Sequence, residues 1–194
     1  QKRGNDRMNN ISVTDWYRQF VRLQVHPGDL CIDATMGNGN DTALLCQLTG
    51  PDGLVLAFDI QEKALSATRH RLDALGIPEN YHLILASHES MEDHAAPDSV
   101  SCIIFNLGYL PGGDHSTCTH ADSSLRAIRK GLRLLKQGGL MAVCIYSGQD
   151  TGFEERDAVL DFVRTLDSRK YLVIQSEYVN RPNHPPIPVL IIKL

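Results

Sequence analysis

Long hydrophobic runs are absent from the sequence. The apolar runs that it has, such as residues 140–146, are far too short to cross a bilayer, and the polar first ten residues lack the apolar core of a signal peptide. The five cysteines form no CxxC pair, and Cys31, Cys102 and Cys144 lie inside apolar runs, where cysteine usually behaves as a small hydrophobe. These absences argue against a membrane or secreted protein and favour a reducing, cytoplasmic setting.

An excess of positive charge is also absent. Nineteen Lys and Arg residues face 23 Asp and Glu residues, and the net charge of -4 argues mildly against a protein that coats nucleic acid. The local exception is the predicted helix 121–139, whose only acid is Asp122. Its basic residues are Arg126, Arg129, Lys130, Arg133 and Lys136. A solvated helix face and an RNA contact explain this patch about equally well.

Short β-rich runs alternate with helical stretches along the chain. The predicted strands are 29–34, 54–60, 81–87, 100–106, 140–146, 171–180 and 187–194, and the predicted helices are 11–25, 41–48, 61–76, 121–139 and 153–167. Only the loop 181–186 separates the last two strands, so we expect them to pair as an antiparallel hairpin. This order predicts an α/β fold: a seven-stranded, mostly parallel sheet with an antiparallel last strand and helices on both faces. We expect residues 1–10 to be a disordered or vector-derived end, and residues 11–194 to form one domain.

The loop "DATMGNGND", residues 33–41, follows the first predicted strand, at the edge where open α/β sheets bind ligands. Gly37 and Gly39 let the backbone turn tightly and let a ligand approach the main chain. A dinucleotide-binding fingerprint requires a third glycine where this chain has Thr42. Asp33 would repel a pyrophosphate, whereas it suits a ligand with an ammonium group.

Asp59 ends the second predicted strand, 59 − 39 = 20 residues after Gly39. A carboxylate at this position can accept hydrogen bonds from both hydroxyls of an adenosine ribose. Adenosine with an amino-acid ammonium and no pyrophosphate describes S-adenosylmethionine, which we expect as the cofactor. The predicted cofactor-binding residues are Asp33, Thr35, Met36, Gly37, Asn38, Gly39, Asn40, Asp41, Thr42, Asp59, Ile60, Gln61, His88, Glu89 and Asn106. His88 is equally consistent with a solvated histidine at a strand end.

Five motifs together resemble one bacterial family: "DATMGNGNDT", "AFDIQEKAL", "HE" at residues 88–89, "FNLGYLPGGD" and "PPIPVLIIKL". The chain is similar, over residues 16–194, to class I methyltransferases long labelled rRNA methylases and now assigned to 5-aminomethyl-(2-thio)uridine at the tRNA wobble position. The resemblance implies a class I (Rossmann-like) methyltransferase fold and a tRNA substrate. The segment "YSGQD" departs from the family, because proline and histidine are expected near Ser147 and Gln149.

The acceptor side is predicted at the end of the fourth strand. Many amino-group methyltransferases carry Asn/Asp-Pro-Pro-Tyr there, and this chain has "NLGY" from Asn106 to Tyr109. The Asn106 oxygen can accept an N–H of an attacking amine, and Tyr109 can stack on a base. Because an aliphatic amine must lose a proton before it attacks, Asp114 and His115 are candidate bases, although substrate contacts or loop structure explain them too.

The segment 114–120 also holds metal-ligand types, at Asp114, His115, Cys118 and His120, but their spacing matches no standard zinc site. We predict no metal. The leading function is methyl transfer to a tRNA amine, with rRNA or a small-molecule amine as the alternative acceptor. A dinucleotide-binding oxidoreductase and a non-catalytic S-adenosylmethionine-binding module are the alternatives from other classes. A homodimer would extend the RNA-binding surface, and the sequence leaves this open.

Overall fold

A computed structural model describes residues 11–108, 121–147 and 152–194. Its centre is a seven-stranded sheet in the order β3-β2-β1-β4-β5-β7-β6. The strands are β1 (Leu30–Asp33), β2 (Leu54–Asp59), β3 (Tyr81–Leu85), β4 (Val100–Leu107), β5 (Leu135–Ile145), β6 (Tyr171–Gln175) and β7 (Ile187–Lys193). Only β7 runs against its neighbours β5 and β6, so the prediction of seven strands with an antiparallel last strand is confirmed.

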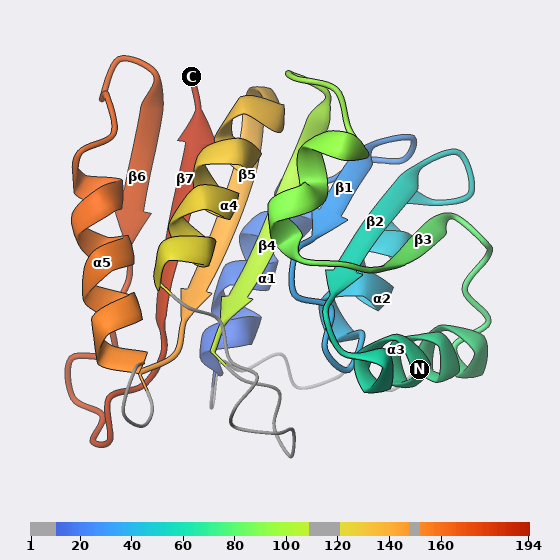
Figure 1. The fold of residues 1–194 in the computed structure, drawn as a ribbon, viewed down its shortest axis with the longest axis horizontal. Coiled ribbons are helices and arrows are strands. Elements are labelled where there is room, and N and C mark those ends of the chain that lie inside the picture. The colour runs from blue at the N-terminus through green and yellow to red at the C-terminus, as the bar shows by residue number, and fades with distance from the viewer. Residues whose placement is uncertain (1–10, 109–120, 148–151) are drawn as a thin grey trace, which may run out of the picture.

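Helices cover both faces of the sheet (Figure 1). They are α1 (Val13–Gln24), α2 (Asn40–Thr49), α3 (Glu62–Ala74), α4 (Ala121–Leu134) and α5 (Gly152–Arg164), with a 3-10 helix η1 (His88–Asp93) before β4. Alternate strand residues face opposite layers: Cys102 and Ile104 pack on the side of α1 and α2, and Ile103 and Phe105 pack on the side of α4 and α5. The central strands β1, β4 and β5 are therefore buried on both faces, as parallel strands usually are, whereas the edge strands β3 and β6 are partly exposed.

Helix α1 shows how local chemistry sets the residue at which a helix begins. Ser12 caps its first turn, because the Ser12 hydroxyl oxygen accepts the Asp15 backbone N–H.

Cys31, Cys102 and Cys144 are buried free thiols, as their apolar surroundings predicted. None of the helices within the described ranges is long and apolar enough to span a membrane.

Two boundaries and one additional helix differ from the sequence prediction. Helix α4 ends at Leu134, and β5 begins at once with Leu135 pairing to Val100, before a register shift around Gly138 brings Leu140 opposite Cys102. Residues 176–180 leave the sheet, so that residues 176–186 connect β6 to β7. Helix η1 was not predicted, since its start depends on Ser87 accepting the Glu89 backbone N–H.

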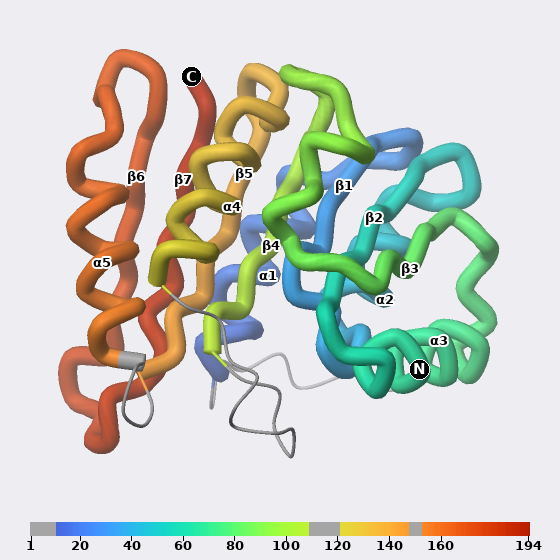
Figure 2. The backbone as a smooth tube through the Cα atoms, viewed as in Figure 1, coloured from blue at the N-terminus to red at the C-terminus, as the bar shows by residue number. Residues whose placement is uncertain are grey.

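The carboxyl ends of the parallel strands meet at one edge of the sheet, the lower edge in Figure 2. The turn between β1 and α2, the end of β4 and the connection between β6 and β7 lie along this edge. It is the edge at which open α/β sheets bind ligands. The candidate residues Tyr109, Asp114 and His115, together with Cys118 and His120, lie outside the described residues.

Candidate cofactor and acceptor site

The glycine loop between β1 and α2 is held tightly against α3. Gly37 and Gly39 both have positive φ angles, 52° and 75°. A Cβ on Gly39 would lie 2.9 Å from the Thr68 backbone, and the Thr68 hydroxyl donates to the Gly37 carbonyl oxygen at 3.1 Å. The positive φ therefore favours glycine at both positions, and Gly39 needs it also because of the contact with Thr68.

Asp33 lies beneath this loop with no exposed surface. Its carboxylate accepts the Thr42 hydroxyl at 2.7 Å and the Thr35 backbone N–H at 3.2 Å. Burial, with the nearby charge of Asp41, raises the pKa of Asp33 to about 7. In this structure Asp33 braces the loop, and its direct contact with a ligand ammonium stays a prediction.

Asp59 stands at the end of β2 and is half-buried. One carboxylate oxygen accepts the Gly37 N–H at 3.1 Å, and the other accepts the Gln61 N–H at 3.0 Å. Each carboxylate oxygen has a second lone pair, so both can still accept a hydroxyl. Ile60, the next residue, is 55% exposed. The arrangement suits the ribose contact predicted from the sequence.

His88 follows β3 and is buried, and its Nε2 has no hydrogen-bond partner among the described residues. Burial lowers its pKa, so the ring is neutral at pH 7, while its other nitrogen bonds the Ala34 backbone. A buried unpaired nitrogen is costly unless a ligand satisfies it. The two carboxylate oxygens of Glu89 accept from the guanidinium of Arg126 at 2.9 and 3.0 Å, and a contact of Glu89 with the cofactor stays a prediction.

Asp41, on the first turn of α2, is the centre of a buried hydrogen-bond network. Its Oδ1 accepts from Arg18 Nε at 2.7 Å, and its Oδ2 accepts from the Tyr17 hydroxyl at 2.7 Å and from Asn106 Nδ2 at 2.9 Å. Arg18 is the charge partner of a carboxylate whose side chain is only 6% exposed. We refer to Tyr17, Arg18, Asp41 and Asn106 as the Asp41 network.

Asn106 is oriented by this network at the end of β4. Its backbone N–H donates to Thr35 Oγ1 at 2.7 Å, and its amide nitrogen points to Asp41. The Tyr17 hydroxyl lies 3.3 Å from Asn106 Oδ1, but its single proton goes to the nearer, charged Asp41. Asn106 Oδ1 therefore keeps its capacity to accept a hydrogen bond from a ligand.

The remaining predicted cofactor residues divide by exposure. Met36 is 3% exposed and packs among Ala57 and Ala64, so its side chain belongs to the core. Asn38 and Asn40 are exposed on the loop, and the Asn38 carbonyl oxygen accepts from Arg71. The structure thus brings the loop, Asp59, His88 and Asn106 to one edge of the sheet.

Sequence reasoning missed two groups of residues at this edge. Tyr17 and Arg18 lie on an amphipathic helix, where a tyrosine usually indicates core; the available signal was that a buried tyrosine hydroxyl needs a partner. Tyr146 follows β5, is 39% exposed and packs against Gly108, where a Cβ would lie 3.2 Å from the Tyr146 Cβ. It therefore walls the same edge beside Asn106.

The basic residues on and after α4 are held by partners within the protein. Arg126 pairs with Glu89, Lys130 and Arg133 pair with Glu92, Lys136 pairs with Asp29, and the Arg129 guanidinium lies 4.4 Å from the centre of the Phe162 ring. Most of these acids belong to η1, which packs on α4. These contacts favour the reading of a structural helix face over that of an RNA contact.

A family model described as "Putative rRNA methylase" matches residues 55–192. The chain belongs to this family. It is 40% identical to a crystal structure of a "putative rRNA-methylase" from Clostridium thermocellum, with a TM-score of 0.91 over 94% of this chain and 98% of that one. It is also 40% identical to a crystal structure of "a putative methyltransferase" from Streptococcus mutans in complex with SAH, with a TM-score of 0.85 over 93% of this chain and 97% of that one.

Among named proteins, the chain is 36% identical over 170 residues to "tRNA (mnm(5)s(2)U34)-methyltransferase, chloroplastic" of Arabidopsis thaliana. That match covers 83% of this chain but only 62% of the Arabidopsis protein. The family and the sheet order together give this chain the fold of class I methyltransferases, a class that uses S-adenosylmethionine. The fold class predicted from the sequence is confirmed.

Proposed function

We propose that this protein transfers a methyl group from S-adenosylmethionine to the 5-aminomethyl amine of the wobble (2-thio)uridine in tRNA. The observation that carries the proposal is the orientation of Asn106 by the Asp41 network at the end of β4, where its Oδ1 keeps a lone pair for a ligand. The name of the Arabidopsis relative supports the same acceptor.

The residues at this edge fit the cofactor. The glycine loop leaves no room for a Cβ at Gly39, the Asp59 oxygens can still accept ribose hydroxyls, and His88 Nε2 is a buried acceptor without a partner among the described residues. An adenine amino group is a donor that would satisfy such a nitrogen. Bound S-adenosylmethionine supplies an electrophilic methyl group on its sulfur.

The protein's own contribution is to orient the acceptor. An amine attacks through its lone pair, so its N–H bonds must point elsewhere, and Asn106 Oδ1 accepts one of them. Tyr146 forms a wall on which the uracil ring can rest. The amine must arrive neutral or lose its proton, and Asp114 and His115 stay the predicted bases for this step.

The family description favours rRNA as the second candidate substrate. Family membership also counts against the dinucleotide-binding oxidoreductase, and the oriented Asn106 counts against a module that only binds S-adenosylmethionine. A small-molecule amine stays a candidate, because in this proposal Asn106 would contact only the amine of the acceptor.

The test is to incubate the protein with S-adenosylmethionine and tRNA that carries unmethylated 5-aminomethyluridine, then to digest the RNA and analyse its nucleosides by mass spectrometry. We expect the 5-methylaminomethyl nucleoside to grow as its precursor declines. Parallel reactions contain rRNA or a free aminomethyl nucleoside. Unchanged tRNA, with cofactor binding established by calorimetry, would contradict the proposed substrate and leave rRNA and small amines to be examined.

A further inference from the structure

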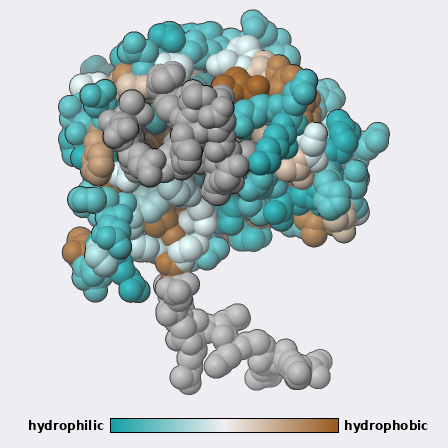
Figure 3. Space-filling model, turned by 60° about the horizontal axis from the view of Figure 1, so that its bottom comes forward, coloured by the Kyte–Doolittle hydropathy of each residue, from teal (hydrophilic) through white to brown (hydrophobic). Residues whose placement is uncertain are grey.

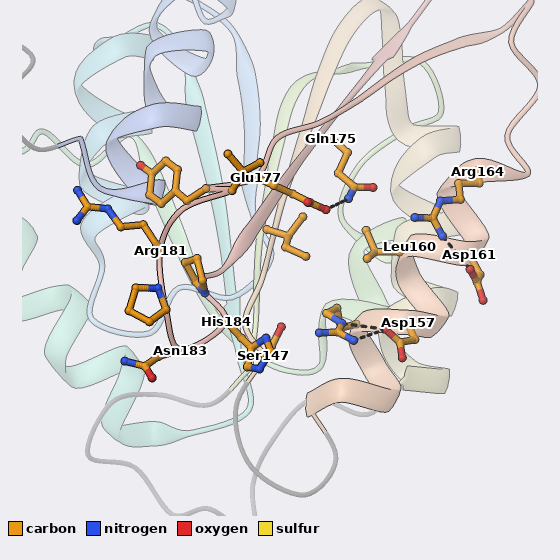
Figure 4. A pocket seen from close by; sticks show the side chains of 16 residues that line it. Ser147, Asp157, Leu160, Asp161, Arg164, Gln175, Glu177, Arg181, Asn183 and His184 are labelled. Atoms are coloured by element: carbon orange, nitrogen blue, oxygen red, sulfur yellow. Dashed lines mark hydrogen bonds and ion pairs between the residues drawn. The ribbon is translucent and has the colours of Figure 1, made fainter.

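A cleft of about 750 Å³ lies between α5 and the connection from β6 to β7 (Figure 4). This connection is on the same edge of the sheet as the end of β4 (Figure 2). Leu160 and Ile187 are among its apolar lining residues, and Gln175, Glu177 and Asn183 supply amide and carboxylate groups. None of these residues belongs to the cofactor site described above. Figure 3, which turns this edge toward the viewer, shows a mainly hydrophilic described surface with small hydrophobic spots.

The sheet register sets the separation between this cleft and Asn106. Asn106 pairs with Cys144 on β5, and the next β5 residue, Ile145, pairs with Ile187 of the cleft. Two strand spacings of about 4.8 Å put Ile187 roughly 10 Å from the end of β4. Ser147, two residues beyond Ile145, lines the cleft itself. The nucleotides beside one held at Asn106 would therefore reach the cleft.

The connection that forms one wall contains two residues in a strained backbone conformation. Asn183 and His184 both have positive φ angles, 65° and 46°, in a segment where Pro182 and Pro185 flank them. Non-glycine residues in this conformation cost free energy, and such strain concentrates at functional sites. The His184 ring also packs edge-on against the Phe153 ring, with centroids 5.4 Å apart, which fixes an aromatic edge at the cleft.

The arginines that line the cleft differ in whether they have an ion-pair partner. Arg156 pairs with Asp157 at 2.7 Å and Arg164 pairs with Asp161 at 3.1 Å, so these four residues neutralise one another. Arg181 makes no ion pair within the described part of the chain, is exposed, and points away from α5 in Figure 4. Glu177 adds a third carboxylate, so the lining is neutral only when Arg181 is counted with it. The amide and carboxylate groups suit the edge of a base, and the guanidinium of Arg181, which has no ion-pair partner among the described residues, suits a phosphate.

We propose that this cleft binds the single-stranded RNA next to the methylated nucleotide, with an unpaired base against His184 and a backbone phosphate on Arg181. This inference rests on the proposed function for the identity of the RNA. Stacking on a ring and pairing with a guanidinium are the usual contacts of proteins with single strands. The basic residues of α4, which are already paired, are not needed for it.

The test measures the affinity of a fluorescently labelled anticodon stem-loop RNA by anisotropy, over a range of salt concentrations. Arg181→Ala should weaken binding several-fold and lower the slope of log K against log salt by about 0.7, the contribution of one single-strand phosphate. His184→Asn removes the ring while asparagine tolerates the positive φ, and it should weaken binding about 5- to 100-fold. Arg22→Ala is the matched control, because Arg22 is exposed near the end of α1 at the opposite edge of the sheet.

Thermal unfolding and cofactor affinity should be unchanged in all three variants, and with tRNA the first two should raise KM rather than lower kcat. If the wild type methylates tRNA while Arg181→Ala and His184→Asn bind RNA normally, the cleft inference is wrong and the proposed function stands. If the wild type fails to methylate tRNA, a labelled oligouridine still tests the cleft, and equal binding by wild type and variants overturns it. If the wild type binds the oligouridine and the two variants do not, the cleft inference holds for an RNA other than tRNA.

Discussion

The Asp41 network makes a quantitative prediction about Arg18. Replacing Arg18 with methionine keeps the apolar stem but removes the only charged partner that the described structure gives Asp41. The Asp41 side chain is 6% exposed, so its carboxylate would stay buried with neutral donors only. Breaking a buried ion pair costs about 3–5 kcal/mol, and because the Arg18 side chain is 23% exposed we expect the lower end, about 3 kcal/mol.

Urea denaturation at neutral pH measures this decrease in the free energy of unfolding of Arg18→Met. Arg22→Met is the matched control: it changes an exposed arginine one turn further along α1 and should alter the free energy of unfolding by less than about 0.5 kcal/mol. Adding Asp41→Asn to Arg18→Met should recover part of the loss, since the uncompensated charge disappears. Equal stabilities for Arg18→Met and Arg22→Met would refute the reasoning that Asp41 is a buried, paired charge.

Four further predictions concern single residues of the site. Asp59→Ala should weaken S-adenosylmethionine binding about 10- to 100-fold by removing the ribose acceptors, and unchanged affinity in calorimetry would exclude that placement. Asn106→Ala should leave the affinity for S-adenosylmethionine intact and lower kcat at least about tenfold, whereas normal turnover would contradict the acceptor role. Gly39→Ala should destabilise the fold by about 2 kcal/mol in urea denaturation, because it combines a positive φ with overlap on Thr68. Burial raises the pKa of Asp33 from 3.8 to about 7, so the native state keeps a proton that the unfolded chain has released, and stability falls as the pH rises from about 4 to 7. Asp33→Asn should flatten that fall in urea titrations at several pH values, and an unaltered slope would exclude Asp33 as its source.

Much of the fold follows from patterns that are local in the sequence. The apolar runs around Cys102 and Cys144 are buried on both faces, which is why they could be read as parallel strands, and the short link after residue 180 indicated the antiparallel end. The start of β5 could not be read in this way. Leu134 and Leu135 continue the apolar pattern of α4, and only pairing of Leu135 with Val100 shows that the helix has ended.

The site was predictable where a residue acts through its own position on a loop or strand end. Gly39 and Asp59 are of this kind, because the turn and the strand end place them whatever the rest of the chain does. The partner of Glu89 could not be predicted in this way. Its carboxylate accepts from Arg126, 37 residues away, and no sequence pattern near either residue indicates that pairing. The partners of Asp41 were likewise hidden, since Tyr17 precedes it by 24 residues.

Helix α1 is for this reason part of the site as well as a cover for the sheet. The match to the family model begins at residue 55, yet the glycine loop, Tyr17 and Arg18 all precede it. Asp41 binds donors from α1 and β4 while it sits on the first turn of α2, directly after the glycine loop. Because a buried carboxylate is costly when any donor is lost, the three elements must keep one relative position. The orientation of the Asn106 amide therefore depends on α1, which joins the cofactor loop to the acceptor strand.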